Sequence, residues 1–238
     1  MPSFIIHSAV ATRLNEYLNL DEELFTIGNI MPDCWRNTPD RDTVKRTRSH
    51  FQPIGEDTKD EDYKYFCNKY KDKMNNPVYL GYLSHLLTDI YWRKYVLPEY
   101  RIFIDGKLYI KSRDGSLIGG SREYIDEFYR NEVHKTNSDL LYKYGIYGFP
   151  DIENVNEIEG FECNIDELDL SGLPKTFKFA NREIDNAFPQ KSIVFSIENL
   201  ENKIEQTVLE VYKEIQKLKS EDLVNENNRI RWKTFRRC

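Results

Sequence analysis

Apolar residues in the first two-fifths of the chain recur at the spacing of an α-helix. Ser3 is a typical cap for a first helix, because its hydroxyl can accept a hydrogen bond from a free backbone N–H group. The apolar face of this helix consists of residues four apart: Ile6, Val10, Leu14 and Leu18. Acidic residues at 21–23 predict the start of a second short helix, which Pro32 ends. Residues 34–56 are rich in Arg, Asp, Thr and Pro, and we expect a loop there.

Two more helices are predicted before the middle of the chain. Apolar residues between 63 and 74 share one face of an amphipathic helix whose other face is strongly charged. Asn76 and Pro77 form a typical cap and first turn for a helix from Val78 to about Tyr95. Because that helix is apolar on nearly all sides, we expect it to lie at the centre of the fold.

A small β-structure is predicted between the helices. Apolar and polar residues alternate around Asp105-Gly106, a pair typical of a two-residue hairpin turn. We therefore expect residues 98–120 to form a hairpin or ordered loop inserted between helices. A further helix is expected from Ser121 to about Leu141.

The C-terminal part of the chain divides into an irregular segment and a long helix. Residues 145–195 contain Gly and Pro, show little periodicity and are expected to be irregular. Apolar residues from Ile197 to Leu218 keep to one face of a long helix. The whole pattern predicts a mainly α-helical fold, with residues 1–238 forming one domain.

Composition and charge exclude several classes of protein. The chain has 34 basic and 40 acidic residues, a net charge of −6, which disfavours binding to duplex nucleic acid. No apolar run reaches the roughly 20 residues of a bilayer-spanning helix. The N-terminal residues lack the features of a signal peptide, and the four cysteines form no CxxC pair. These features predict a cytoplasmic protein with free thiols and disfavour a cysteine-based zinc knuckle.

Candidate chemistry begins with His85 and Asp89 on the central helix. A spacing of four residues places an imidazole and a carboxylate on one helical face, where both can reach a single divalent ion. A charged aspartate on so apolar a helix is costly to bury without a partner, and a cation is one such partner. The alternative interpretation is an ordinary His–Asp hydrogen bond on a partly exposed face.

Three further residues extend this pair to a set of three histidines and two aspartates. His7 lies beside the apolar face of the first helix, Asp33 follows directly after Pro32, and His50 ends the basic segment. Each has an unremarkable explanation alone: a boundary histidine, a turn aspartate and a loop histidine. Together with His85 and Asp89 they form a set suited to one or two zinc-like ions.

The order of these motifs resembles the zinc-dependent phospholipase C family, which is related to the single-strand-specific zinc nucleases. The resemblance covers roughly residues 1–95 and rests on His7 and three short motifs. They are Gly-x-Ile-x-Pro-Asp at 28–33, Ser-His-Phe at 49–51 and Gly-Tyr-Leu-x-His-Leu-x-x-Asp at 81–89. The resemblance implies a mostly helical fold that binds zinc and cleaves phosphodiesters with a metal-activated water.

The resemblance also implies a role for each residue of the set. Asp33, His50, His85 and Asp89 would hold one zinc ion, and Asp89 would bridge to a second ion bound by His7. Asp33 would orient or deprotonate the attacking water, a role consistent with a carboxylate beside a metal ion. The expected substrate is a phosphodiester, either a phospholipid headgroup ester or a nucleotide.

This chain departs from the family pattern at two places. Family members use an N-terminal tryptophan as a ligand, whereas this chain begins with Met1, and of the downstream ligands for a third metal only His134 is present. We therefore expect one or two ions, zinc or another divalent metal, instead of three. His134 is a candidate additional metal ligand or substrate contact, or else a surface histidine.

Two other functions remain compatible with the sequence. One is a single-strand nuclease or nucleotidase that uses the same metal site, and the other is a non-catalytic, metal-stabilised binding protein. The basic residues between Asp33 and His50 could contact phosphate groups or form a solvated face: Arg36, Arg41, Lys45, Arg46 and Arg48. The chain lacks the phosphate-binding loop, the dinucleotide-binding glycine motif, HExxH and GxSxG, which disfavours nucleotide-driven chemistry and the commonest zinc proteases.

Overall fold

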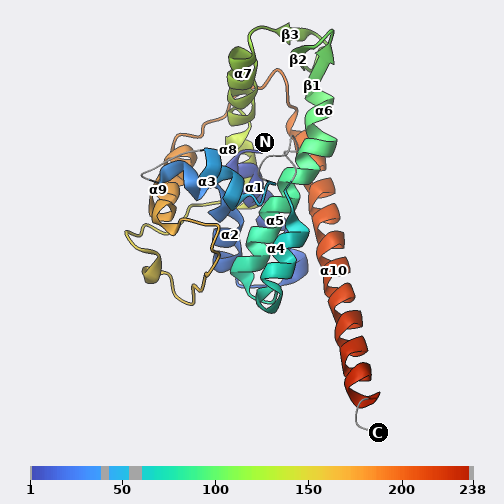
Figure 1. Ribbon diagram of the computed structural model, residues 1–238. Coiled ribbons are helices and arrows are strands. Elements are labelled where there is room, and N and C mark those ends of the chain that lie inside the picture. Colours follow the sequence, from blue (N-terminus) through green and yellow to red (C-terminus); the bar gives the residue numbers. More distant parts are fainter. Residues whose placement is uncertain (1, 39–42, 54–60, 236–238) are drawn as a thin grey trace.

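The computed structural model describes residues 2–38, 43–53 and 61–235, with residues 221–235 described as backbone. The fold is mainly helical with one small antiparallel sheet, which confirms the predicted fold class (Figure 1). The longer helices are α1 (Phe4–Leu18), α2 (Glu22–Ile30), α5 (Pro77–Tyr91), α7 (Arg122–His134), α9 (Leu173–Asp185) and α10 (Ile197–Phe235). The shorter helices are α3 (Thr43–Ser49), α4 (Tyr63–Lys69), α6 (Leu97–Tyr100) and α8 (Asn137–Tyr144). The remaining turns are η1 (Met31–Asn37), η2 (Lys71–Lys73), η3 (Trp92–Val96), η4 (Val155–Glu157) and η5 (Leu170–Gly172).

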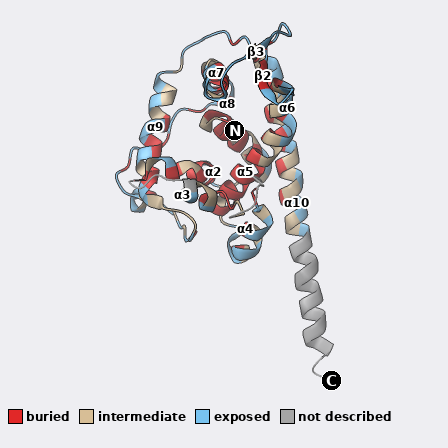
Figure 2. Ribbon diagram, turned by 45° about the horizontal axis from the view of Figure 1, so that its top comes forward, coloured by how far each residue is buried: buried red, intermediate tan, exposed pale blue. Residues whose placement is uncertain are grey.

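Helices α1, α2 and α5 form the centre of the molecule, with α10 along one side (Figure 1). Buried residues concentrate on these central helices, and α5 is buried from Val78 through Asp89 (Figure 2). Two glycines let α2 and α5 approach closely. A Cβ atom on Gly28 would lie 2.1 Å from the Val78 carbonyl oxygen, and one on Gly81 would lie 2.1 Å from that of Phe25. The close approach brings the C-terminal end of α2 against the middle of α5.

The predicted helix starts are found where local hydrogen bonding favours them. The Ser3 hydroxyl accepts from the Ile6 N–H group, and the Asn76 side chain accepts from the Val78 N–H group at the start of α5. Helix α5 then continues through the π-helical turn η3 into α6. No helix in the described part of the chain is long and apolar enough to cross a lipid bilayer.

The predicted hairpin is present and carries a third strand. Strand β1 (Arg101–Ile104) pairs antiparallel with β2 (Lys107–Lys111), in the register Arg101↔Ile110 and Ile104↔Lys107. Asp105 and Gly106 form the turn with positive φ values of 49° and 73°. Strand β3 (Leu117–Gly119) continues the sheet beside β2.

Three segments differ from the prediction. Residues 34–56, expected to be a loop, contain η1 and α3, and the irregular segment 145–195 contains the thirteen-residue helix α9. The helix expected from Ser121 to Leu141 is two helices, α7 and α8. The helical pattern is interrupted at Lys135 and Thr136, where the Thr136 N–H group bonds to the Val133 carbonyl three residues back and the Thr136 hydroxyl donates to the same carbonyl.

Candidate metal centre

Four separate elements bring the five predicted residues into one cluster. His7 comes from α1, Asp33 from η1, His50 from the residue after α3, and both His85 and Asp89 from α5. The three histidines and Asp89 are at most 1% exposed, whereas 16% of the Asp33 side chain is exposed. The cluster is therefore a buried site that is open to solvent on the side of Asp33.

The ligand atoms of the cluster lie within a few ångströms of one another. His7 Nε2 is 3.3 Å from Asp89 Oδ1, whereas His50 Nε2 and His85 Nε2 are each 3.9 Å from Asp89 Oδ2. Asp33 Oδ1 is 3.6 Å from His50 Nε2. These atoms make up two groups of three that could each hold a metal ion: His7, His85 and Asp89, and Asp33, His50 and His85.

Hydrogen bonds outside the cluster fix which nitrogen of two histidines carries the proton. His85 Nδ1 lies 2.7 Å from the Asn29 carbonyl oxygen, and His50 Nδ1 lies 3.1 Å from that of Arg46. A carbonyl oxygen can only accept, so the Asn29 contact requires a protonated His85 Nδ1, and the Arg46 contact favours the same state for His50. When these rings are neutral, each Nε2 presents a lone pair to the cluster. Carbonyl partners of this kind are typical of metal-bound histidines.

The pKa shifts favour neutral histidines beside charged aspartates. Burial lowers the pKa of His85 to about 3, and it also lowers the pKa of His50. Burial alone would raise the pKa of Asp33, but Arg36, whose Nε is 3.1 Å from Asp33 Oδ1, holds it well below its usual value. His7 has the same effect on the pKa of Asp89. Imidazole lone pairs and carboxylate oxygens therefore face one another.

The cluster leaves buried polar atoms without hydrogen bonds. Six ligand atoms have no hydrogen-bond partner among the described residues. They are both ring nitrogens of His7, both carboxylate oxygens of Asp89, and the Nε2 atoms of His50 and His85. Each unsatisfied buried polar group costs about 1–3 kcal/mol, more when it is charged. A cation among these atoms would satisfy both the lone pairs and the carboxylates, so the cluster fits a divalent metal ion. The alternative of a partly exposed, hydrogen-bonded His85–Asp89 pair does not fit this burial.

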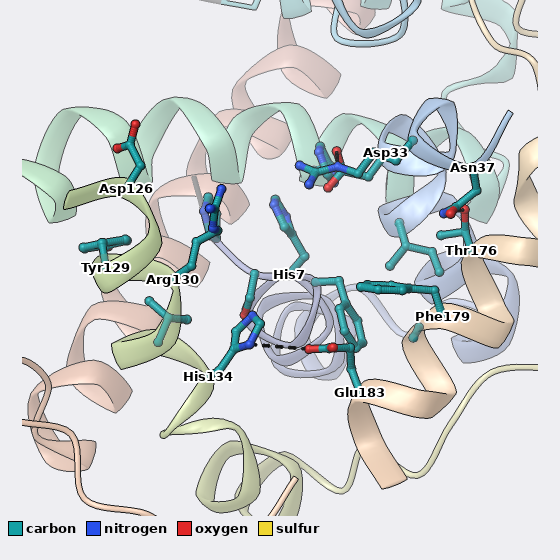
Figure 3. Close-up of a pocket in the computed structure, with 18 of the residues that line it drawn as sticks. His7, Asp33, Asn37, Asp126, Tyr129, Arg130, His134, Thr176, Phe179 and Glu183 are labelled. Carbon is teal, nitrogen blue, oxygen red and sulfur yellow. Dashed lines mark hydrogen bonds and ion pairs between the residues drawn. The ribbon is translucent and has the colours of Figure 1, made fainter. Parts of the chain in front are cut away.

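The cluster opens into a cavity of about 410 Å³ (Figure 3). Its lining includes His7, Asp33 and His85 on one side, and it also includes three arginines: Arg36, Arg101 and Arg130. The two remaining walls are supplied by α7 and α9. The cavity therefore combines candidate metal ligands with three arginines, two of which pair with acids of the same lining, Asp33 and Asp126.

Specific contacts hold α7 and α9 at the cavity. On α7, the buried Glu132 carboxylate accepts from the Ser192 hydroxyl and the Ile193 N–H group, both at 2.7 Å. Helix α9 lies against η1, where the Asn37 side-chain amide donates to the Thr176 hydroxyl at 2.9 Å. A Cβ atom on Gly172, just before α9, would lie 2.3 Å from the Cys34 carbonyl oxygen, so only glycine permits this approach.

His134 lies on the α7 wall of the cavity, apart from the five-residue cluster. Its Nδ1 is 3.7 Å from Glu183 Oε2 on α9, and 47% of its side chain is exposed (Figure 3). It belongs to neither of the two candidate metal groups found in the described part of the chain. Its position fits the alternative of a contact to substrate better than that of a metal ligand.

Sequence reasoning missed the other cavity residues on α7 and α9. Asp126, Arg130 and His134 follow one another at intervals of four and line the cavity together. This spacing is visible in the sequence, but charged residues on a helix more often form a solvated face. Of the basic residues noted between Asp33 and His50, Arg36 lines the cavity, Lys45 pairs with Asp169 at 3.0 Å, and Arg41 lies outside the described residues.

A second missed acid, Glu61, lies buried near the cluster. Burial and the nearby Asp89 raise the pKa of Glu61 to about 7, although Arg93 of η3 forms an ion pair with it. Its immediate neighbours in the sequence, Asp60 and Asp62, are charged, so they do not indicate burial. Arg93 thus supplies the charge partner that a buried carboxylate requires.

No model of a known protein family matches this chain, and comparisons with curated proteins and with solved structures likewise give no match. The chemistry of the site therefore has to be inferred from its own residues.

Proposed function

We propose that this chain is a zinc-dependent hydrolase of phosphodiesters, similar in chemistry to the phospholipase C family that its first part resembles. The observation that carries the proposal is the set of buried, unpaired ligand atoms beside an arginine-lined cavity. Neutral imidazole nitrogens suit zinc, and the additional carboxylates are ligands that zinc also accepts.

The geometry of Asp89 supports two ions that share this carboxylate. Its Oδ1 faces His7, whereas its Oδ2 faces His50 and His85. In the proposed arrangement, Asp33, His50, His85 and Asp89 hold one ion and His7 helps to hold a second. With one ion, the same five residues would still supply enough ligands for a four-coordinate site.

Hydrolysis joins a water oxygen to phosphorus and breaks the ester P–O bond, and the departing alcohol takes up a proton. Bound zinc supplies Lewis acidity towards phosphoryl oxygens and lowers the pKa of a coordinated water. Asp33 is the carboxylate of the cluster that lines the cavity, and its Oδ1 lies beside His50 Nε2. Because Arg36 keeps the pKa of Asp33 low, this carboxylate is a weak base, and we assign it to ligand binding and orientation of the water. Arg36 and Arg101 would attract the phosphate into the cavity.

Hydrolysis of a chromogenic diester by the zinc-loaded protein tests this proposal. Bis(p-nitrophenyl) phosphate reports diester cleavage, while a short-chain phosphatidylcholine and a single-stranded oligonucleotide separate the phospholipase from the nuclease alternative. We expect Asp33→Ala and exhaustive chelation each to reduce hydrolysis at least ~100-fold. Substitution of a residue that only supports a metal ligand usually has a smaller effect. Asp72→Asn, which changes an exposed aspartate outside the cavity, should retain activity.

Undiminished hydrolysis after chelation would contradict the proposal. Loss of the fold on chelation, with no activity on any of the three substrates, would instead support the metal-stabilised binding protein.

A further inference from the structure

The α7 wall of the cavity carries a line of polar side chains that the proposed chemistry does not use. Asp126, Arg130 and His134 occupy one face of α7, one turn apart, and all three line the cavity with Glu183 of α9 opposite (Figure 3). Their shared orientation makes this wall a second polar surface, distinct from the candidate metal ligands.

The charges of this wall leave one cation unpaired. Asp126 forms ion pairs with Arg101 and Arg122, and Glu183 lies beside His134. Asp33, the third acid in the lining, pairs with Arg36. Arg130, by contrast, has neither an ion pair nor a hydrogen bond to any described residue.

We infer that Arg130 binds a second negative charge on the substrate, beyond the charge that a simple phosphodiester carries. This inference rests on the proposed function, because it places the scissile phosphate at the metal cluster. The second charge is a phosphate oxygen, either on the scissile phosphate of a monoester or on a neighbouring phosphate group. A guanidinium matches such oxygens in both charge and geometry.

The same arginine disfavours substrates with a cationic group at this wall. A positive charge there would meet Arg130, and two of the three acids in the lining, Asp33 and Asp126, already pair with arginines. Apolar side chains such as Phe4, Val133 and Phe179 complete the lining and leave room for an apolar part of the substrate. Choline esters should therefore be poor substrates, and esters with an additional phosphate should be good ones.

Matched substrate pairs test Arg130→Gln against the wild-type protein. One pair is p-nitrophenyl phosphate and bis(p-nitrophenyl) phosphate, which places the extra charge on the scissile phosphate. The other is the p-nitrophenyl ester of thymidine 5′-phosphate with and without a 3′-phosphate, which places it on a neighbouring group. The p-nitrophenyl ester of phosphorylcholine supplies the cationic comparison. Arg113→Gln is the control, because Arg113 is exposed, has no side-chain partner among the described residues and does not line the cavity.

We expect Arg130→Gln to reduce the kcat/KM preference for the doubly charged member of at least one pair about tenfold, the size of one charge-assisted contact. The pair that responds identifies the source of the charge. Hydrolysis of the choline ester should rise relative to the simple diester. The zinc content and helical content of Arg130→Gln should match those of the wild-type protein. Arg113→Gln should keep the substrate preferences of the wild-type protein.

Calorimetric binding of phenylphosphonate gives a readout that does not depend on turnover. Arg130→Gln should weaken it about tenfold if the arginine holds a phosphoryl dianion or an adjacent charge. Unchanged preferences in both substrate pairs, together with unchanged phosphonate binding, would overturn the inference while leaving the proposed function intact. Absence of hydrolysis in every protein would overturn the proposed function, and phosphonate binding would still decide the role of Arg130.

Discussion

The two sides of the cavity are built in opposite ways. The metal-ligand side takes buried, unpaired side chains from tightly packed helices, whereas the α7 and α9 side presents exposed residues that pair with one another, such as His134 and Glu183. Atoms that must hold a cation are kept in place by the core, since they have no other partner. Side chains that meet a variable part of a substrate can remain mobile at the surface. Under the proposed function, metal binding and substrate choice thus belong to different parts of the fold.

Gly81→Ala should have the largest effect on stability, because it disturbs the packed helices on the metal-ligand side of the cavity. The added Cβ would lie 2.1 Å from the Phe25 carbonyl oxygen, so α2 and α5 would have to separate. We expect a loss of about 3 kcal/mol in the free energy of unfolding, at the upper end for overpacked cores, with weaker zinc binding. Urea denaturation and a zinc titration measure the two effects.

Gly120→Ala is the matched control for this substitution. Its Cβ would meet only the ring of Tyr124, which is half exposed and can move. A change below about 0.5 kcal/mol in Gly81→Ala would show that the close helix contact does not support the cluster.

A smaller loss of stability should appear when the metal-free protein is acidified. The folded pKa of His85 is about 3, below its ordinary value of 6.5, so below pH 6.5 the unfolded chain takes up a proton that the folded chain does not. The free energy of unfolding should fall by roughly 2 kcal/mol between pH 7 and pH 5 from His85 alone. His50, whose pKa is also lowered, changes stability in the same direction. Asp33 and Asp89 do so only at still lower pH.

A histidine variant tests the assignment of this effect to the buried cluster. His85→Gln removes the buried imidazole and should show a weaker pH dependence than the wild-type protein. Parallel pH profiles for His85→Gln and the wild-type protein would contradict the assignment of a neutral, buried His85.

Local signals were sufficient to predict two of the helices that carry the cluster, α1 and α5. Ser3, Asn76 and Pro77 mark helix starts through hydrogen bonds to nearby backbone groups, and these starts appear where the sequence predicts them. The spacing of His85 and Asp89 requires only that their segment be helical. That His7, Asp33 and His50 converge on this pair was inferred from a resemblance, because no local rule brings distant segments together.

Contacts between distant segments explain what the sequence did not predict. Helix α3 has no apolar stripe, and it is held at η1 by the Ser49 hydroxyl, which donates to the Pro32 carbonyl at 2.9 Å. Helix α9 does carry apolar residues at helical spacing, but only over thirteen residues and among Gly and Pro. The role proposed for Arg130 depends on α9 lying opposite α7, and α9 is held against η1 through Thr176.

The metal content of the purified protein is the most direct test of the proposed zinc site. Elemental mass spectrometry on the wild-type protein and on His85→Ala, each after exposure to zinc and removal of the excess, counts the ions held by the cluster. We expect one or two equivalents of zinc in the wild-type protein and loss of zinc in His85→Ala, because His85 belongs to both candidate groups of ligands. A wild-type protein that binds no zinc under these conditions, or a His85→Ala variant that keeps its full content, would contradict the proposed site.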